Sequence, residues 1–140
     1  MFMLDTNVLS AIMGSRPVPE VAAWVAAQAE ELLFTASVCQ AEILAGIEIL
    51  PDGHRRRTLE AAAQAIFADD FDGRILPFDE KAARCYAENF AARKRAGKPT
   101  ATTDLMIAAV ARAKGATMVT RNTADFEGCG LAVINPWAVA

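Results

Sequence analysis

The chain has 140 residues, of which 54% are hydrophobic, and a formal net charge of −3. This length is expected to form one domain over residues 1–140 with its own core. The acidic balance argues against a generally basic nucleic-acid-binding surface, and no apolar run approaches the roughly 20 residues that a membrane-spanning helix needs. We therefore expect a soluble, cytoplasmic protein without a membrane segment.

The cysteines and the histidine exclude several kinds of chemistry. Cys39, Cys85 and Cys129 are widely spaced and form no CxxC pair, so neither a disulfide framework nor a zinc site is expected. His54 is the single histidine and lies in a turn-like stretch. Any catalysis must therefore depend on carboxylates.

Strand-like and helix-like segments alternate along the whole chain, beginning with a short apolar strand and a helix after it. Strands are predicted at residues 2–4, 32–36, 74–78, 117–120 and 131–134. Helices are predicted at residues 8–13, 17–29, 37–50, 55–67, 80–95 and 100–114, with at most one turn at 123–126. This alternation predicts an α/β fold, a three-layer α/β/α sandwich around a five-stranded, mainly parallel sheet.

Three local signals refine these elements. Ser37 and Gln40 have the spacing of a capping box, which predicts a helix start directly after a strand. Pro77 predicts an edge strand or a strand end. Asp79 stands where a helix N-cap is expected, so we assign it a structural role.

Carboxylates or amides occur near strand ends or in the opening turns of helices at four places: Asp5, Glu42, Asp104, and the segment 121–125 with Asn122 and Asp125. Each has a structural interpretation as well. Asp5 could cap the first helix, Asp104 could be an ordinary first-turn acid, Asp125 could form an Asx turn, and Glu42 could simply be exposed.

Two of these acids have informative neighbours. Glu42 shares a helix face with Gly46, which predicts that it faces a cleft. Asp104 lies in the first turns of its helix, where the helix dipole and the hydroxyls of Thr102 and Thr103 are expected to keep it ionised.

Parallel topology favours a shared site, because right-handed crossovers bring the carboxyl ends of the strands to one edge of the sheet. Carboxylates that meet there repel one another and raise each other's pKa unless a cation is bound. Without histidine or a thiol cluster, coordination by oxygen alone favours Mg²⁺ or Mn²⁺.

Taken together, these segments resemble the PIN domain and, within it, the VapC-like toxins of type II toxin–antitoxin systems. The stretches that carry the resemblance are LDTNVLS (4–10), AEILAG (41–46), TDLMIAA (103–109), and VTRN (119–122) with DF (125–126). RILPFD (74–79), GK (97–98) and NPW (135–137) look most like the FitB-like branch.

The resemblance implies a Mg²⁺- or Mn²⁺-dependent endoribonuclease. Its catalytic acids would be Asp5, Glu42 and Asp104, which would also be the metal ligands, with Thr6 supporting the first. Many relatives have an acid where this chain has Asn122, so Asp125 is the candidate to supply the fourth charge. One-metal and two-metal operation both stay open.

The resemblance also implies that the protein forms a homodimer and acts on RNA. It further implies a VapB-like or FitA-like antitoxin as partner, with operator DNA bound only through that antitoxin. Two basic runs could hold RNA phosphates or could be solvated helix ends: Arg55, Arg56 and Arg57, and Arg93, Lys94, Arg95 and Lys98.

The sequence is also compatible with two other functions. A haloacid-dehalogenase-like phosphatase also begins with an Asp after an N-terminal strand, but it needs Asp-x-Asp, and this chain has Asn7 in the third position. An inactive PIN-like module that only binds RNA or protein is made plausible by Asn122.

Overall fold

The computed structural model describes residues 1–138 and contains one five-stranded sheet. The strands are β1 (Phe2–Leu4), β2 (Leu33–Ala36), β3 (Ile75–Leu76), β4 (Thr117–Val119) and β5 (Val133–Ile134). The α-helices are α1 (Thr6–Ile12), α2 (Pro19–Ala26), α3 (Ser37–Glu48), α4 (His54–Gln64), α5 (Glu80–Arg95) and α6 (Thr102–Lys114). Short 3₁₀ helices cover Glu30–Leu32 and Thr123–Phe126, and a π-helical segment covers Ala65–Asp70.

The strand order is β3-β2-β1-β4-β5, and every pairing is parallel. The predicted five-stranded sheet is confirmed, and β3 is an edge strand as Pro77 indicated. β1 lies at the centre, with Phe2 beside Leu33 on one side and Thr117 on the other. All carboxyl ends therefore face the same edge of the sheet.

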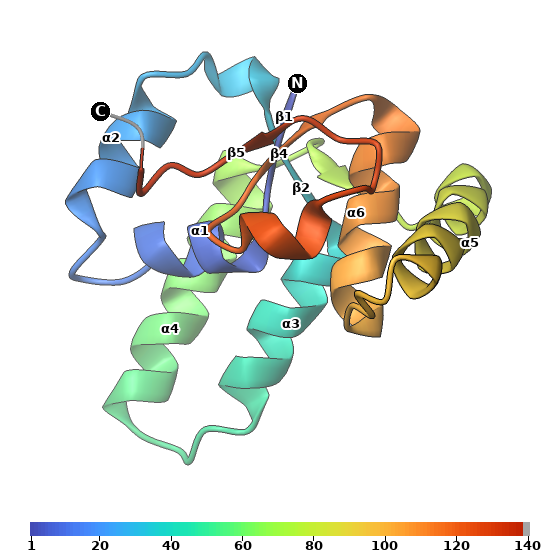
Figure 1. The fold of residues 1–140 in the computed structure, drawn as a ribbon. Helices are drawn as coiled ribbons and strands as arrows, with labels where there is room; N and C mark the ends of the chain where they lie inside the picture. Colours follow the sequence, from blue (N-terminus) through green and yellow to red (C-terminus); the bar gives the residue numbers. More distant parts are fainter. Residues whose placement is uncertain (139–140) are drawn as a thin grey trace.

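Helices lie on both sides of this sheet (Figure 1), with α5 and α6 together on one side and α1 and α2 on the other. α3 and α4 extend below the strands as a hairpin. The predicted α/β sandwich is confirmed. Among residues 1–138, no helix is long and apolar enough to cross a membrane.

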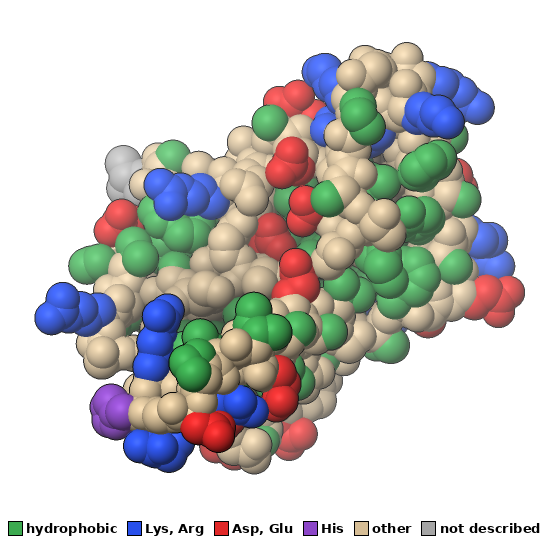
Figure 2. Space-filling view, turned by 90° about the horizontal axis from the view of Figure 1, so that it is seen from below, with side chains coloured by type: hydrophobic (Ala, Val, Ile, Leu, Met, Phe, Trp, Pro, Cys, Tyr) green, Lys and Arg blue, Asp and Glu red, His purple; other side chains and the backbone are tan. Residues whose placement is uncertain are grey.

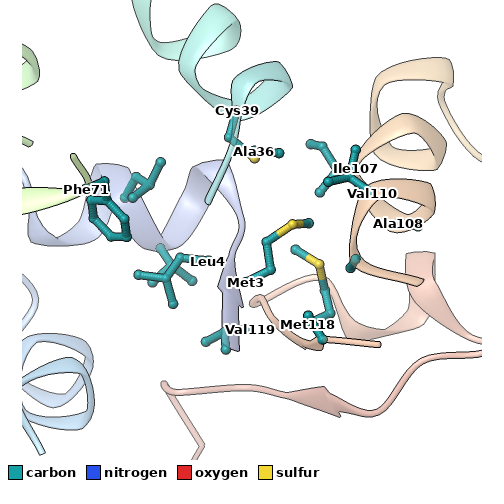
Figure 3. Packing of buried hydrophobic residues seen from close by; sticks show 14 of the residues in the cluster. Met3, Leu4, Ala36, Cys39, Phe71, Ile107, Ala108, Val110, Met118 and Val119 are labelled. Carbon is teal, nitrogen blue, oxygen red and sulfur yellow. The ribbon is translucent and has the colours of Figure 1, made fainter. Parts of the chain in front are cut away.

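The side chains of the two central strands are buried on both faces of the sheet. Met3 and Met118 point toward α6, whereas Leu4 and Val119 point to the opposite side, where Phe71 lies (Figure 3). This alternation follows from the two-residue period of a strand. A sheet covered on both faces explains why its strands are short continuous apolar runs.

Helix α3 begins at Ser37 directly after β2, as predicted, but without the expected capping interaction. Ser37 begins α3 as its first helical residue, the cap position is Ala36, and no side chain accepts a hydrogen bond there. The predicted capping box is therefore wrong, because β2 runs directly into the helix. Asp79 does cap α5, since its Oδ1 accepts from the Ala82 amide at 2.9 Å.

Candidate active site

Asp5 lies between the end of β1 and the start of α1, and only 3% of its surface is exposed. Its Oδ1 accepts from the Thr6 amide at 2.8 Å, so the residue does cap α1. Its Oδ2 accepts from the Thr120 hydroxyl at 2.7 Å and from Asn7 Nδ2 at 3.3 Å. The capping interaction thus uses one oxygen, and donors from two separate segments hold the other.

Burial raises the pKa of Asp5 from 3.8 to about 6. The hydrogen bonds from Thr120 and Thr6 lower the pKa, and the nearby negative charges of Asp104 and Glu42 raise it further. Desolvation disfavours the charged form of a carboxylate and the donors only partly offset it. Asp5 is therefore a buried acid close to two others.

Glu42 lies one turn into α3 and is exposed, and its Oε1 accepts from the Thr6 hydroxyl at 2.6 Å. Thr6 therefore bridges two acids, with its amide on Asp5 and its hydroxyl on Glu42. The resemblance assigned Thr6 to the first acid. Its amide does bond to Asp5, and its side chain also bonds to Glu42. This bond fixes the direction of an otherwise free carboxylate.

Glu42 borders a hollow of about 240 Å³ between α1, α3 and α4. Thr6 and Gly46 also line it, and a Cβ on Gly46 would meet nothing within 4 Å. The prediction that Glu42 faces a cleft beside Gly46 is confirmed.

Asp104 lies in the first turn of α6 and is half-buried. Its pKa is raised, first by desolvation and then by the negative charges of Asp125 and Glu42. We expected the helix dipole and neighbouring hydroxyls to keep this group ionised. The pKa is nevertheless raised, because burial and the neighbouring acids act against ionisation.

Asp125 lies on the 3₁₀ helix Thr123–Phe126, close enough to Asp104 to raise its pKa. Residues three apart lie nearly above one another in a 3₁₀ helix. Position 125 therefore follows position 122 by about one turn, with the Asp125 amide donating to the Asn122 carbonyl at 3.1 Å. The acid that this turn brings near Asp104 is therefore Asp125.

No counter-charge neutralises these four acids. In the described part of the chain, no Lys or Arg forms an ion pair with Asp5, Glu42, Asp104 or Asp125. Seen from below, which is the carboxyl edge of the sheet, acidic side chains gather at the middle of the face, with basic ones at its margins (Figure 2). Uncompensated carboxylates of this kind fit a hard cation.

The atoms that these four acids offer to a metal ion are all carboxylate oxygens, which Mg²⁺ and Mn²⁺ prefer as ligands. Across residues 1–138, however, no three carboxylate, imidazole or thiol groups already stand close enough to form a ligand set. A cation would need to draw the carboxylates closer together than they stand in this structure.

Sequence reasoning missed the roles of Asn7 and Thr120. Thr120 directly follows β4, is fully buried, and accepts from Asn7 Nδ2 at 3.2 Å and from the Asn122 amide at 3.1 Å. The sequence does show a polar residue, Thr120, at the end of β4. That Thr120 contacts Asp5 follows only from the strand order, because β4 lies beside β1.

The basic runs are only partly surface clusters. Arg93 is 6% exposed and donates to Thr100 Oγ1 and to the carbonyls of Ala124 and Glu127. It therefore stabilises the fold and does not have the expected RNA-binding role. Arg56 clamps the α3–α4 hairpin through Glu48, Asp52 and Glu60.

The other basic side chains of the two runs are exposed: Arg55, Arg57, Lys94, Arg95 and Lys98. Of these, Lys98 pairs with Glu127 at 3.7 Å. Lys94 lies over the Phe90 ring, 5.8 Å from its centroid.

A family model described as PIN domain matches residues 2–128. The chain belongs to the PIN-domain family. It is 39% identical over 140 residues to VapC ribonuclease Y4jK of Sinorhizobium fredii, with 100% of both chains covered. It is 36% identical to Toxin FitB of Neisseria gonorrhoeae, covering 98% of this chain and 99% of FitB.

Solved structures agree with this assignment. A chain of FitAB bound to an IR36 DNA fragment has a TM-score of 0.92 and 35% identity, covering 100% of this chain and 98% of that one. A chain of FitAcB from Neisseria gonorrhoeae has a TM-score of 0.87 and 33% identity, covering 99% and 100%. The resemblance to PIN domains with FitB-like features is confirmed.

The raised pKa of Asp5 predicts how stability depends on pH without divalent ions. Between pH 3.8 and about 6 the folded protein holds a proton that the unfolded chain has lost. The free energy of unfolding should therefore fall by about 3 kcal/mol as pH rises through this window. Urea unfolding in EDTA from pH 4 to 7 measures it.

Asp5→Asn should remove most of this decrease and be the more stable protein at pH 7. The exposed residue Asp72 offers a matched control, because Asp72→Asn should retain the wild-type dependence. An unchanged pH dependence in Asp5→Asn would show that Asp5 does not carry the shifted proton.

Proposed function

We propose that this protein is a divalent-metal-dependent endoribonuclease and the toxin of a type II toxin–antitoxin module. The observation that carries the proposal is the group of four acids without counter-charge at the carboxyl edge of a PIN-domain sheet. The similarity to VapC ribonuclease Y4jK and Toxin FitB supports both the activity and the biological role.

Asp5 and Asp104 would be direct ligands of Mg²⁺ or Mn²⁺, and Glu42 would be a ligand or would orient the attacking water. Asp125, rather than Asn122, would complete the negative charge, and its electrostatic effect on Asp104 supports this choice. A bound divalent ion would lower the pKa of water and stabilise negative charge on a phosphoryl group.

The chain's own residues contribute orientation. Thr120 and Asn7 hold Asp5 Oδ2 in place, so this carboxylate needs little rearrangement when it acts. Thr6 fixes Glu42 Oε1, which leaves Oε2 to accept a proton or a hydrogen bond from water. The attack on the phosphodiester would be in line, and the leaving oxygen would be protonated by water.

The partners follow from the relatives. We propose a homodimer and a small FitA-like or VapB-like antitoxin that places a basic side chain against the acids, with operator DNA contacted through the antitoxin. The similarity to a FitAB chain in a DNA-bound structure supports this arrangement. We further propose that residues 1–140 act as one PIN domain in the cytoplasm.

Loss of either of two acids should abolish cleavage. In Asp104→Asn and Glu42→Gln, cleavage of a single-stranded RNA should fall by at least about 10³-fold, equivalent to about 4 kcal/mol of activation free energy. Mn²⁺ should raise the melting temperature of the EDTA-treated wild type and raise that of Asp104→Asn less.

Asp72→Asn serves as the control and should cleave at the wild-type rate. Wild-type cleavage in both acid variants would overturn the assignment. Absence of both cleavage and a Mn²⁺ shift in the wild type would favour the inactive binding module. A phosphoryl group trapped on Asp5 by beryllium fluoride would favour the phosphatase.

The exposed basic side chains at the ends of α4 and α5 are proposed to hold RNA phosphates. Charge reversal of Arg55 and Arg57 to Glu, or of Lys94 and Arg95 to Glu, should weaken RNA binding by roughly tenfold at low salt. Fluorescence anisotropy with a labelled oligonucleotide measures this. If both double variants bind RNA as tightly as the wild type, the two basic runs are solvated helix ends without a role in RNA binding.

A further inference from the structure

Arg121 and Trp137 form a basic and aromatic pair at the edge of the sheet that carries the acids. Arg121 is the second residue after β4, and Trp137 is the third after β5. These two strands are parallel neighbours, so both residues lie beyond the carboxyl edge. The Arg121 guanidinium carbon lies over the indole ring, 5.3 Å from its centroid.

Both members of the pair are tied to the framework. The Arg121 amide donates to Asn7 Oδ1 at 3.2 Å, and the same Asn7 side chain donates to Asp5 Oδ2. The Trp137 amide donates to Asn135 Oδ1 at 3.0 Å, and its ring packs against the core. The backbone of Arg121 is therefore fixed in relation to Asp5 by two successive hydrogen bonds.

No group in residues 1–138 accepts a hydrogen bond from the Arg121 guanidinium. In residues 1–138 its side chain is exposed and forms neither an ion pair nor a hydrogen bond. By contrast, Arg74 donates to backbone carbonyls and Arg112 pairs with Glu88 at 2.7 Å. The cation–π contact with Trp137 occupies none of the N–H donors of the guanidinium, so they stay available.

A polyanionic substrate needs such a residue here. RNA phosphates that flank the scissile bond would be repelled by the four carboxylates, and a cation close to them offsets this repulsion. A guanidinium binds a phosphate through two parallel hydrogen bonds.

We propose that Arg121, supported by Trp137, binds a backbone phosphate of single-stranded RNA next to the scissile position. This inference rests on the proposed ribonuclease function and adds a substrate-positioning residue to it. The contact with Trp137 restricts the Arg121 side chain, so that less side-chain entropy is lost when the phosphate binds.

Steady-state kinetics and a salt series test the pair. Arg121→Ala should raise KM for a single-stranded RNA about tenfold while kcat stays within roughly threefold, the pattern expected when ground-state binding is lost. The salt dependence of binding should weaken by about 0.7 in log–log slope, the value for one phosphate contact on a single strand. Binding is measured by anisotropy in the Asp104→Asn background, which prevents cleavage.

The matched control is Lys114→Ala, which removes one exposed cation at the opposite end of α6. It should leave KM, kcat and the salt slope unchanged. Arg121→Lys should be intermediate because the ammonium lacks the planar fork, and Trp137→Leu should shift KM in the same direction as Arg121→Ala by a smaller factor.

The outcomes separate the two proposals. If the wild type cleaves RNA and Arg121→Ala retains its KM and salt slope, the role of Arg121 is overturned and the ribonuclease assignment stands. A fall in kcat at unchanged KM would likewise overturn the binding role. If the wild type neither binds nor cleaves RNA, the proposed function fails, and this inference fails with it.

Discussion

The Asp5 carboxylate is buried at the end of the central strand, and hydrogen bonds from Thr6, Asn7 and Thr120 hold it there. These bonds join β1, the start of α1 and the end of β4, so one side chain links three segments of the framework. The donors only partly offset the cost of removing the charge from water, which leaves the pKa at about 6. The remaining acids, and the anchoring of Arg121 through Asn7, are arranged around this residue.

The parallel strand order explains why acids distant in the chain become neighbours. β1, β2 and β4 lie side by side, and the segments that follow them carry Asp5, Glu42 and the Thr120–Asp125 region. Asp104 joins them from the first turn of α6. Their mutual repulsion lowers the stability of the folded chain, and a bound cation would remove that penalty. The same carboxylates thus destabilise the metal-free fold and are required for the proposed catalytic function.

The sequence predicted the sheet and most helices because apolar periodicity, Asp79 and the glycine after α6 are local signals. It predicted the shared site because parallel topology constrains where strand ends meet. It could not predict that Thr120 meets Asp5, since this depends on β4 lying beside β1. Nor could charge patterning separate buried Arg93 from exposed Lys94, because both occur in one basic run on α5. The short turn that places Asp125 near Asp104 likewise required three-dimensional geometry.

The proposed function requires these acids to hold a divalent metal ion. An anomalous difference map from crystals soaked in Mn²⁺ tests it most directly, because the map locates the ion without reference to activity. If the proposed function is right, a peak is expected within about 2.0–2.4 Å of carboxylate oxygens of Asp5 and Asp104, with Glu42 or Asp125 completing the ligands directly or through water. A map without a peak at the carboxyl edge of the sheet, or with the ion bound elsewhere on the molecule, would contradict it.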